Sequence, residues 1–493
     1  MRNTLLTDIA LVLVSLIASI PIQVIAENIC PAQLQTEIEK VSQSSRLKTA
    51  RVGIFVQTNA ANPKILANLD GDRYFLPASN TKLFTTATAL KVLGADYRFA
   101  THLMSHDLPN AKGELESGLW LIGSGDPSFN SETSLKDLVS QLKAKGVKHI
   151  KGGIWTITSR KGVEVSDSWE WSDLQHYYAA IASPFTINEN ALDWEVRPAK
   201  IGKPPIFRWE KPALAKGWHI HNQAITGSAD SAYTLKVMRP YNQKHLIITG
   251  QIPEKVTPEL GGVAIPNPEV NFLSLLSQEL TIQGIDISTN SADIYTNVNA
   301  KKLLPTQDLA IALSPPLSQL IITTNKDSNN LYAELLLRAL GDRFHEISLD
   351  DLNDSVDAGL LAINKYLESI HIATEQVSLV DGSGLSRQNL STPRAIAQLL
   401  ETLATDQNFR RSLPISHLDG TLKDRFKAQN NRVSLQAKTG SFTGTMALSG
   451  YAKPANYDEV IFSIIINNST LPYRELENCL DEIVLIITRL KPC

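Results

Sequence analysis

FLPASNTKLFTT, residues 75–86, places a serine and a lysine three positions apart where a helix is expected to begin. Residues i and i+3 lie on one face of a helix, so the amine of Lys82 can reach the hydroxyl of Ser79. Core-facing apolar residues follow as far as Leu93, and Gly94 is a typical helix end. Ser79 is therefore either a nucleophile activated by Lys82 or an ordinary helix cap.

The S-x-x-K spacing alone does not decide between these two interpretations, because it also occurs at Ser45–Lys48 and Ser140–Lys143. Only Ser79 follows a Pro-Ala turn and opens an apolar-striped helix. A lysine that acts as a base must be neutral near pH 7, which requires a pKa about 3 units below its usual value of about 10.4. Burial and a second nearby cation can lower the pKa in this way. The chemistry therefore predicts another positive group beside Lys82.

Two later motifs supply the groups that this chemistry needs. Lys438-Thr439-Gly440-Ser441 contains the only K-[ST]-G of the chain and stands before the strand-like run MALSGYA. Its lysine is the expected second cation, its threonine offers a hydroxyl to a carboxylate, and its glycine allows a substrate backbone to approach closely. Ser328-Asn329-Asn330 heads the helical run LYAELLLRALG, where a hydroxyl can relay a proton and an amide can hold a substrate.

The order S-x-x-K, S-x-N, K-T-G resembles that of the serine D-Ala-D-Ala peptidases and β-lactamases. Finer matches resemble one branch, the class C low-molecular-mass penicillin-binding proteins, which are D-alanyl-D-alanine carboxypeptidases and endopeptidases. The resemblance covers most of the mature chain. The stretches that carry it are LPASNTKLFTTATAL (76–90), GSGDPSF (123–129), SPFTINEN (183–190), DGSGLSRQNLSTP (381–393) and LDGTL (418–422).

The resemblance implies a serine-type mechanism that passes through an acyl-enzyme and uses neither a metal nor a cofactor. Ser79 attacks the carbonyl of the penultimate D-alanine, with Lys82 as general base. Ser328 relays the proton toward the leaving D-alanine. Lys438 keeps the amine of Lys82 uncharged and helps to bind the terminal carboxylate. Peptidoglycan stem peptides and cross-bridges are the implied substrates, and β-lactam antibiotics the implied covalent ligands.

The same resemblance implies the substrate-binding residues. Asn330 hydrogen-bonds the acyl part of the substrate, and Thr439 binds the terminal carboxylate beside Gly440. The backbone N–H groups of Ser79 and Ser441 form the oxyanion hole. The run Asp381–Gly384 is first of all a turn, so we expect a structural role near the cleft.

The spacing of the motifs predicts a large insertion. Lys82 and Ser328 lie far further apart than two neighbouring helices of one compact domain require, and residues 104–302 read as short strands. We expect a catalytic domain in two segments, 27–103 and 303–493. The fold class is α/β (α+β), a penicillin-binding transpeptidase-like domain with an antiparallel sheet packed by helices. The β-rich insertion has two parts, 104–187 with 262–302, and 188–261 nested inside.

The start of the chain predicts export. Arg2 precedes an apolar run from Ile9 to Ile20, and Val24-Ile25-Ala26 forms a small-residue cleavage pattern. The alternative is an uncleaved anchor, but the run falls short of the roughly 20 residues of a spanning helix and is interrupted at Pro21. We therefore expect residues 1–26 to be removed as a signal peptide, which leaves a periplasmic or extracytoplasmic enzyme without a permanent membrane span.

The overall charge argues against nucleic-acid binding, and the histidines give little support for a metal site. The formal net charge is −3 and basic runs are missing, so nucleic acid is not an expected partner. His219 and His221 have the spacing of a metal pair on a strand, but the sequence offers no recognisable third ligand.

The three cysteines suggest a link between the chain ends. A Cys30–Cys479 disulfide would clamp the termini together in an oxidising compartment, and three unpaired cysteines are the alternative. The choice between Cys479 and Cys493 as partner of Cys30 stays open, as does the oligomeric state.

Two alternative functions share these motifs. A β-lactamase needs fast deacylation, which class A enzymes obtain from a Glu in an E-x-x-L-N stretch after the S-x-N. No such stretch occurs between Ser328 and Lys438, and the nearest imitation, ENALD at 189–193, lies in the insertion. A non-catalytic penicillin-binding wall sensor would have lost turnover, but all three motifs are intact.

Overall fold

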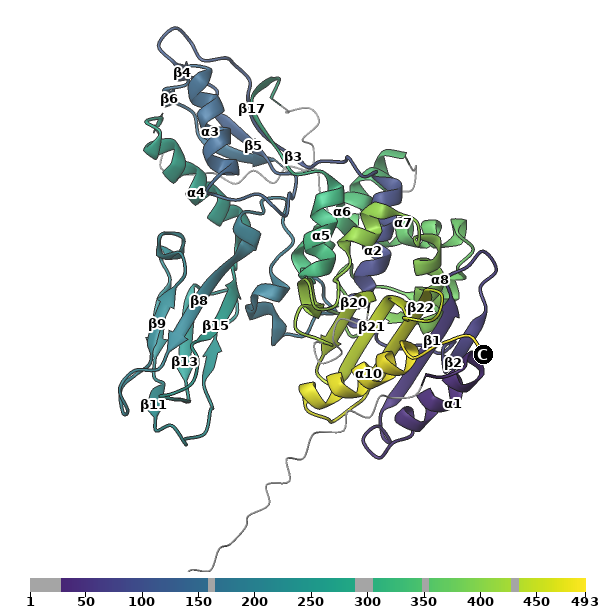
Figure 1. Ribbon diagram of the computed structural model, residues 1–493. Coiled ribbons are helices and arrows are strands. Elements are labelled where there is room, and N and C mark those ends of the chain that lie inside the picture. The colour runs from purple at the N-terminus through teal and green to yellow at the C-terminus, as the bar shows by residue number, and fades with distance from the viewer. Residues whose placement is uncertain (1–27, 158–164, 289–304, 348–353, 427–433) are drawn as a thin grey trace, which may run out of the picture.

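The chain folds into a main body and an inserted region that projects from it, as the computed structural model in Figure 1 shows. The structure describes residues 28–157, 165–288, 305–347, 354–426 and 434–493. The predicted signal peptide, residues 1–26, lies outside the described residues. Inside these ranges, no helix combines the length and the apolar character that crossing a membrane requires.

An antiparallel sheet forms the centre of the main body, as predicted. Its strands come from both ends of the chain, because β1 pairs with β22 and places Arg51 opposite Asn467. The edge strand β20 carries the Lys438 motif. The order across the sheet is β2 (Ile65–Leu69), β1 (Arg51–Thr58), β22 (Val460–Asn467), β21 (Thr445–Lys453) and β20 (Ser434–Phe442).

Helices cover both faces of this sheet, which explains why β22 is buried at every residue and reads as a continuous apolar run. On one face, α1 (Pro31–Ser42) and α10 (Tyr473–Ile487) pack against the strands (Figure 1). The larger core lies on the other face. The helices of that face are α2 (Thr81–Val92), α5 (Leu317–Lys326), α6 (Asn330–Ile347), α7 (Ser355–Ser369), α8 (Pro393–Thr402) and α9 (Gln407–Ser412).

The inserted region begins with a sheet that contains both the strand entering the insertion and the strand leaving it. The chain enters through β3 (Ala100–Ser105) and returns through β17 (Gln307–Leu313), and these two strands pair with each other. Helices α3 (Ser134–Ala144) and α4 (Pro268–Ile282), which the sequence analysis did not predict, contribute to the core on this sheet. The other strands here are β5 (Leu119–Ile122) and β7 (Ile154–Ile157), with β4 (Glu114–Leu115), β6 (His149–Ile150) and β16 (Asp286–Ile287) in a smaller sheet.

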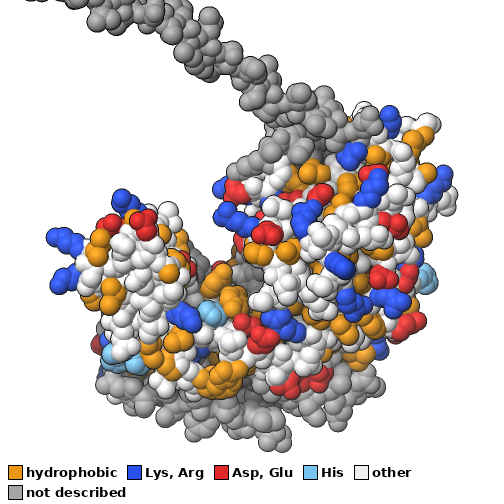
Figure 2. All heavy atoms as spheres, turned by 90° about the horizontal axis from the view of Figure 1, so that it is seen from below, with side chains coloured by type: hydrophobic (Ala, Val, Ile, Leu, Met, Phe, Trp, Pro, Cys, Tyr) orange, Lys and Arg blue, Asp and Glu red, His pale blue; other side chains and the backbone are white. Residues whose placement is uncertain are grey.

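A second group of strands, β8 to β15, forms a separate lobe (Figure 1). Figure 2 shows a hollow between this lobe and the main body. The β-rich character of the insertion is confirmed, while its division into two nested parts stays a prediction. The strands are β8 (Ala191–Arg197), β9 (Ile206–Trp209), β10 (His219–Asn222), β11 (Ile225–Gly227), β12 (Lys236–Met238), β13 (His245–Thr249), β14 (Gln251–Pro253) and β15 (Glu259–Ala264).

A disulfide joins the two ends of the described chain, but the expected pairing was wrong. Cys30 pairs with Cys493, with their Cα atoms 5.6 Å apart, and not with Cys479. Cys479 is a free cysteine. It lies on the face of α10 that packs against the sheet, so its side chain is buried in the core.

Candidate active site

The stretch quoted first folds as a 3-10 turn, η1 (Ala78–Asn80), followed by α2, which begins at Thr81 and not at Ser79. Ser79 is therefore not the helix cap; Asn80 occupies that position, and no side-chain hydrogen bond caps α2 in the described residues. Asn80 Nδ2 instead donates to Ser449 Oγ at 2.8 Å, which ties the turn to β21. Ala78, directly before Ser79, has a φ of 47°, a left-handed conformation that its surroundings must impose.

Lys82 is fully buried beside Ser79. Its Nζ lies 3.0 Å from Ser79 Oγ and donates to Asn330 Oδ1 at 2.6 Å and to the Ser383 carbonyl at 2.7 Å. Burial lowers the pKa of Lys82 to about 7, although the carboxylates of Asp381 and Glu334 act in the opposite direction. A substantial fraction of Lys82 is therefore neutral at neutral pH.

The contacts of Lys82 suit a base. A neutral amine carries two hydrogens and one lone pair. If the hydrogens go to Asn330 Oδ1 and the Ser383 carbonyl, the lone pair is left for the Ser79 hydroxyl. Ser79 can then donate its proton to Lys82 Nζ.

Lys438 lies on β20, fully buried, and contacts the S-x-N motif. Its Nζ donates to Ser328 Oγ and to the Thr439 carbonyl, both at 2.8 Å. Burial, followed by the charge of Lys82, holds the pKa of Lys438 well below its usual range. The expected role of Lys438 as the cation that keeps Lys82 neutral stays a prediction, and burial is the dominant cause of the low pKa of Lys82.

Gly440 is the contact point between β20 and η1. A Cβ atom at this position would lie 2.8 Å from the Pro77 carbonyl oxygen and 2.9 Å from the Ser79 nitrogen. The expected reason for the glycine was room for a substrate backbone. The structure gives an additional one, since only glycine lets the nucleophile turn pack this closely on the strand.

The edge of β20 that faces away from β21 is paired with residues 414–416 near Gln436 and presents backbone donors next to the nucleophile turn. Ala437 N–H donates to the Pro414 carbonyl at 3.0 Å, which points away from β21. Because N–H directions alternate along a strand, the N–H of Ser441 faces the same edge. The Thr439 hydroxyl, also near this edge, donates to Thr421 Oγ1 at 2.7 Å.

The S-x-N motif sits at the amino end of α6. Ser328 has a φ of 56°, the second left-handed non-glycine residue of the site. Asn329 Oδ1 accepts a hydrogen bond from Tyr332 N at 3.2 Å and so caps the helix. Asn330 Nδ2 donates to the Tyr178 carbonyl at 2.7 Å, which turns its Oδ1 toward Lys82.

The run Asp381–Gly384 lies in the loop between β18 (Val377–Ser378) and β19 (Leu390–Ser391). The buried Asp381 carboxylate accepts hydrogen bonds from within the loop and from Trp169 Nε1 at 3.0 Å. Glu334 of α6 accepts from two further loop amides. The loop has the expected structural form, and through the Ser383 carbonyl it also reaches Lys82.

Sequence reasoning missed three groups that hold this site, Trp169, the Tyr178 carbonyl and Glu334. Trp169 and Tyr178 belong to the insertion, and their contacts with the main body bridge more than 150 positions of sequence. A carbonyl has no sequence signature at all. Glu334 lies one helical turn after Asn330, and this spacing was the one available signal.

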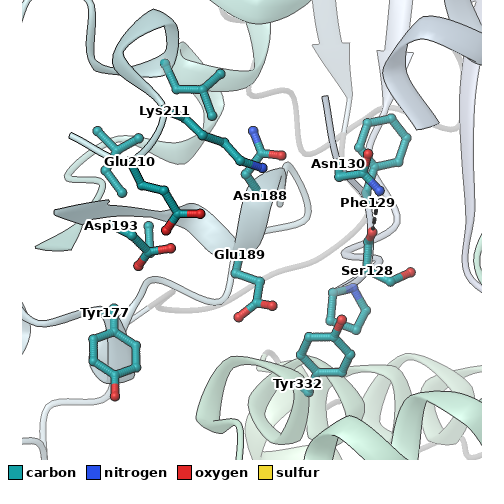
Figure 3. Close-up of a pocket in the computed structure, with 14 residues that line it drawn as sticks. Ser128, Phe129, Asn130, Tyr177, Asn188, Glu189, Asp193, Glu210, Lys211 and Tyr332 are labelled. Carbon is teal, nitrogen blue, oxygen red and sulfur yellow. Dashed lines mark hydrogen bonds between the residues drawn. The ribbon is translucent and has the colours of Figure 1, made fainter. Parts of the chain in front are cut away.

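A pocket of about 370 Å³ lies beside the S-x-N motif, between the insertion and Tyr332 of α6 (Figure 3). Glu189 reaches from its wall to Asn329, whose Nδ2 donates to Glu189 Oε2 at 2.7 Å. None of the four catalytic residues predicted from the sequence lines this pocket. Across the described ranges, the structure brings together no group of three or more His, Cys, Asp or Glu side chains that could hold a metal ion.

Comparison with known proteins identifies similar chains and structures. The sequence model of the family described as D-Ala-D-Ala carboxypeptidase 3 (S13) matches residues 34–490. D-alanyl-D-alanine carboxypeptidase of Actinomadura sp. strain R39 is 29% identical over 96% of this chain and 88% of its own. Penicillin-sensitive carboxypeptidase A of Dictyostelium discoideum is 30% identical over 84% of this chain and 82% of its own. The crystal structure of penicillin-binding protein 4 from Haemophilus influenzae superposes with a TM-score of 0.77 and 25% identity, over 91% of this chain and 97% of that one.

Proposed function

Because the chain belongs to the D-Ala-D-Ala carboxypeptidase 3 (S13) family, we propose that it hydrolyses the D-Ala-D-Ala bond of peptidoglycan stem peptides through an acyl-enzyme on Ser79. The observation that carries the assignment of Ser79 is the contact of its hydroxyl with a fully buried lysine whose pKa is about 7. A helix cap would need no such neighbour. The resemblance stated from the motifs is confirmed at the level of the family.

Acylation begins when Ser79 Oγ attacks the carbonyl carbon of the penultimate D-alanine while its proton passes to Lys82 Nζ. The negative charge that develops on the carbonyl oxygen is stabilised by the N–H groups of Ser79 and Ser441, since the nucleophile turn packs against β20 at Gly440. The C–N bond then breaks. Ser328, hydrogen-bonded to Lys438, relays a proton to the leaving D-alanine nitrogen: it gives up its hydroxyl proton and is reprotonated by the proton that Lys82 took from Ser79, which leaves Lys82 neutral again.

Substrate binding uses the two motifs that flank the nucleophile. Thr439 and Lys438 bind the terminal carboxylate at the edge of β20, beside Gly440. Asn330 hydrogen-bonds the acyl part of the substrate with its amide. Water then hydrolyses the ester of Ser79 and releases the shortened peptide.

The same chemistry extends to cross-links and antibiotics. The bond between two cross-linked stem peptides follows a D-alanine carbonyl, so we assign DD-endopeptidase activity to the same site. A β-lactam presents a strained amide and a carboxylate, and it acylates Ser79 covalently. The Haemophilus influenzae structure has also been solved in complex with a β-lactam, at 24% identity.

The place of action follows from the substrate. Peptidoglycan lies outside the cytoplasm, and the Cys30–Cys493 disulfide is stable in an oxidising compartment. We therefore assign the enzyme to the periplasm or another extracytoplasmic space, reached by means of residues 1–26. We propose that the catalytic domain comprises the two segments expected from the sequence, 27–103 and 303–493, except for the paired strands β3 and β17 at their inner ends, which belong to the sheet of the insertion.

Labelling with a fluorescent penicillin tests the nucleophile. Wild type takes up one label per chain and Ser79→Ala none, while Ser140→Ala, at another S-x-x-K serine, labels like wild type. Labelling of Ser79→Ala would overturn the assignment. Release of D-alanine from a pentapeptide ending in D-Ala-D-Ala, and cleavage of dimeric muropeptides, then measure turnover. A protein that labels but is silent in both assays would be a penicillin-binding sensor.

A further inference from the structure

The direction of the Lys82 lone pair depends on two acceptors, the Asn330 amide oxygen and the Ser383 carbonyl. If either acceptor turns away, an N–H of the amine can rotate toward Ser79 and the lone pair is lost to catalysis. The groups that hold these two acceptors in place therefore also determine the direction of the Lys82 lone pair.

Both acceptors are held from the insertion. We call residues 165–190, which lead into β8, the connecting segment. Its Tyr178 carbonyl accepts from Asn330 Nδ2 at 2.7 Å, and this bond makes the other end of the amide, Oδ1, the one that faces Lys82. Its Trp169 donates through Nε1 to the carboxylate of Asp381, which organises the loop that carries the Ser383 carbonyl.

The contact made by Trp169 is well placed to hold that loop. The Trp169 side chain and Asp381 are both buried, and Asp381 Oδ2 accepts from Trp169 Nε1 at 3.0 Å and from Ser386 N at 2.7 Å. Its other oxygen, Oδ1, accepts from Gly384 N and Asn389 Nδ2. Removal of one donor leaves a buried carboxylate with an unmet hydrogen bond, which costs more than the loss of an exposed contact.

The connecting segment makes further contacts after Trp169. Glu170 forms an ion pair with Arg387, whose guanidinium stacks on Phe442 at the end of β20. Tyr178 donates its hydroxyl to Asp173 Oδ1 at 3.0 Å, which braces the turn that presents the Tyr178 carbonyl. The segment therefore contacts the loop and α6 directly and is linked to the end of β20 through Arg387.

We propose that the connecting segment is a positioning element of the active site: Trp169 and the Tyr178 carbonyl hold the two acceptors that aim the lone pair of Lys82 at Ser79. The inference rests on the proposed roles of Ser79 and Lys82. It gives the insertion a part in the chemistry in addition to any part in binding. Trp169 donates its N–H to Asp381 and so acts on Lys82 through the loop, which makes it a positioning residue.

The test compares two neighbouring tryptophans. Trp169→Phe keeps an aromatic ring and removes the N–H, and Trp171→Phe makes the same change at a side chain that is 69% exposed and stacked on Tyr241. Stopped-flow acylation by a chromogenic penicillin separates the dissociation constant of the first complex from the acylation rate constant. We expect Trp169→Phe to acylate about tenfold more slowly with an unchanged dissociation constant, and Trp171→Phe to stay within about twofold of wild type.

A second variant separates positioning from folding. Replacing Trp169 by β-(3-benzothienyl)alanine keeps the shape of the indole and substitutes sulfur for the N–H, so the fold is retained and the slow acylation should persist. Wild-type acylation in both Trp169 variants, or a loss confined to the melting temperature, would overturn the inference. Failure of the wild type itself to acylate would instead refute the role of Ser79.

Discussion

The pH dependence of acylation follows from the burial of Lys82. Its pKa falls from 10.5 to about 7, a difference that corresponds to about 5 kcal/mol between the two protonation states. Only the neutral amine can accept the proton of Ser79, so the acylation rate constant must rise with pH through this pKa. The neutral fraction is about one half at pH 7, about 9% at pH 6 and about 1% at pH 5.

The measurement is the rate constant of acylation by a chromogenic penicillin between pH 5 and pH 9, with circular dichroism to confirm that the fold is intact at each pH. We expect a rise of about two orders of magnitude that levels off above pH 8. Lys91→Met removes an exposed lysine from the end of the same helix and should leave the profile unchanged. A flat profile, or one still rising toward pH 10, would refute the reasoning that burial makes Lys82 the base.

Two further predictions concern packing and the chain ends. Gly440→Ala should slow acylation at least about tenfold, because the new Cβ would collide with the Pro77 carbonyl and with the Ser79 nitrogen and so displace the nucleophile. The melting temperature should change little. Acylation at the wild-type rate would show that η1 can move aside. Cys493→Ser should lower the free energy of unfolding by about 2–5 kcal/mol in denaturant titrations. Reduction should lower the free energy of unfolding of the wild type by the same amount and leave that of the variant unchanged. A decrease in both proteins would show that reduction acts on something other than the Cys30–Cys493 disulfide.

The sequence predicted the parts of the molecule that depend on local spacing. The three motifs, the helix after Ser79 and the buried strand VIFSIIIN each carry their pattern within a few residues, and the fold class and family that follow from them are confirmed. The sequence also led us to expect a lowered pKa for Lys82, and burial lowers it.

The parts that could not be predicted depend on what the fold brings together. Burial of Lys82 is a property of the packed core and cannot be read from a motif. In the sequence, Lys438 was therefore the more visible explanation for a low pKa of Lys82. Cys479 and Cys493 are equally available in the sequence, and only the inward turn of α10 at Cys479 decides between them. The Trp169 contact joins segments that no motif connects, and α3 and α4 were missed inside a region that reads as strands.

The pairing of β1 with β22 has a consequence for how the protein is made. β1 can pair with β2 as soon as both have been synthesised, but its other neighbour, β22, ends at Asn467, so the centre of the sheet forms only when the chain is almost completely made. Ser79 leaves the ribosome early, yet the sheet against which its turn packs does not exist until the last strands arrive. A product stalled before β21 and β22 therefore leaves one edge of β1 unpaired and the nucleophile turn without its packing partner, and the Cys30–Cys493 disulfide can close only after these strands have been made.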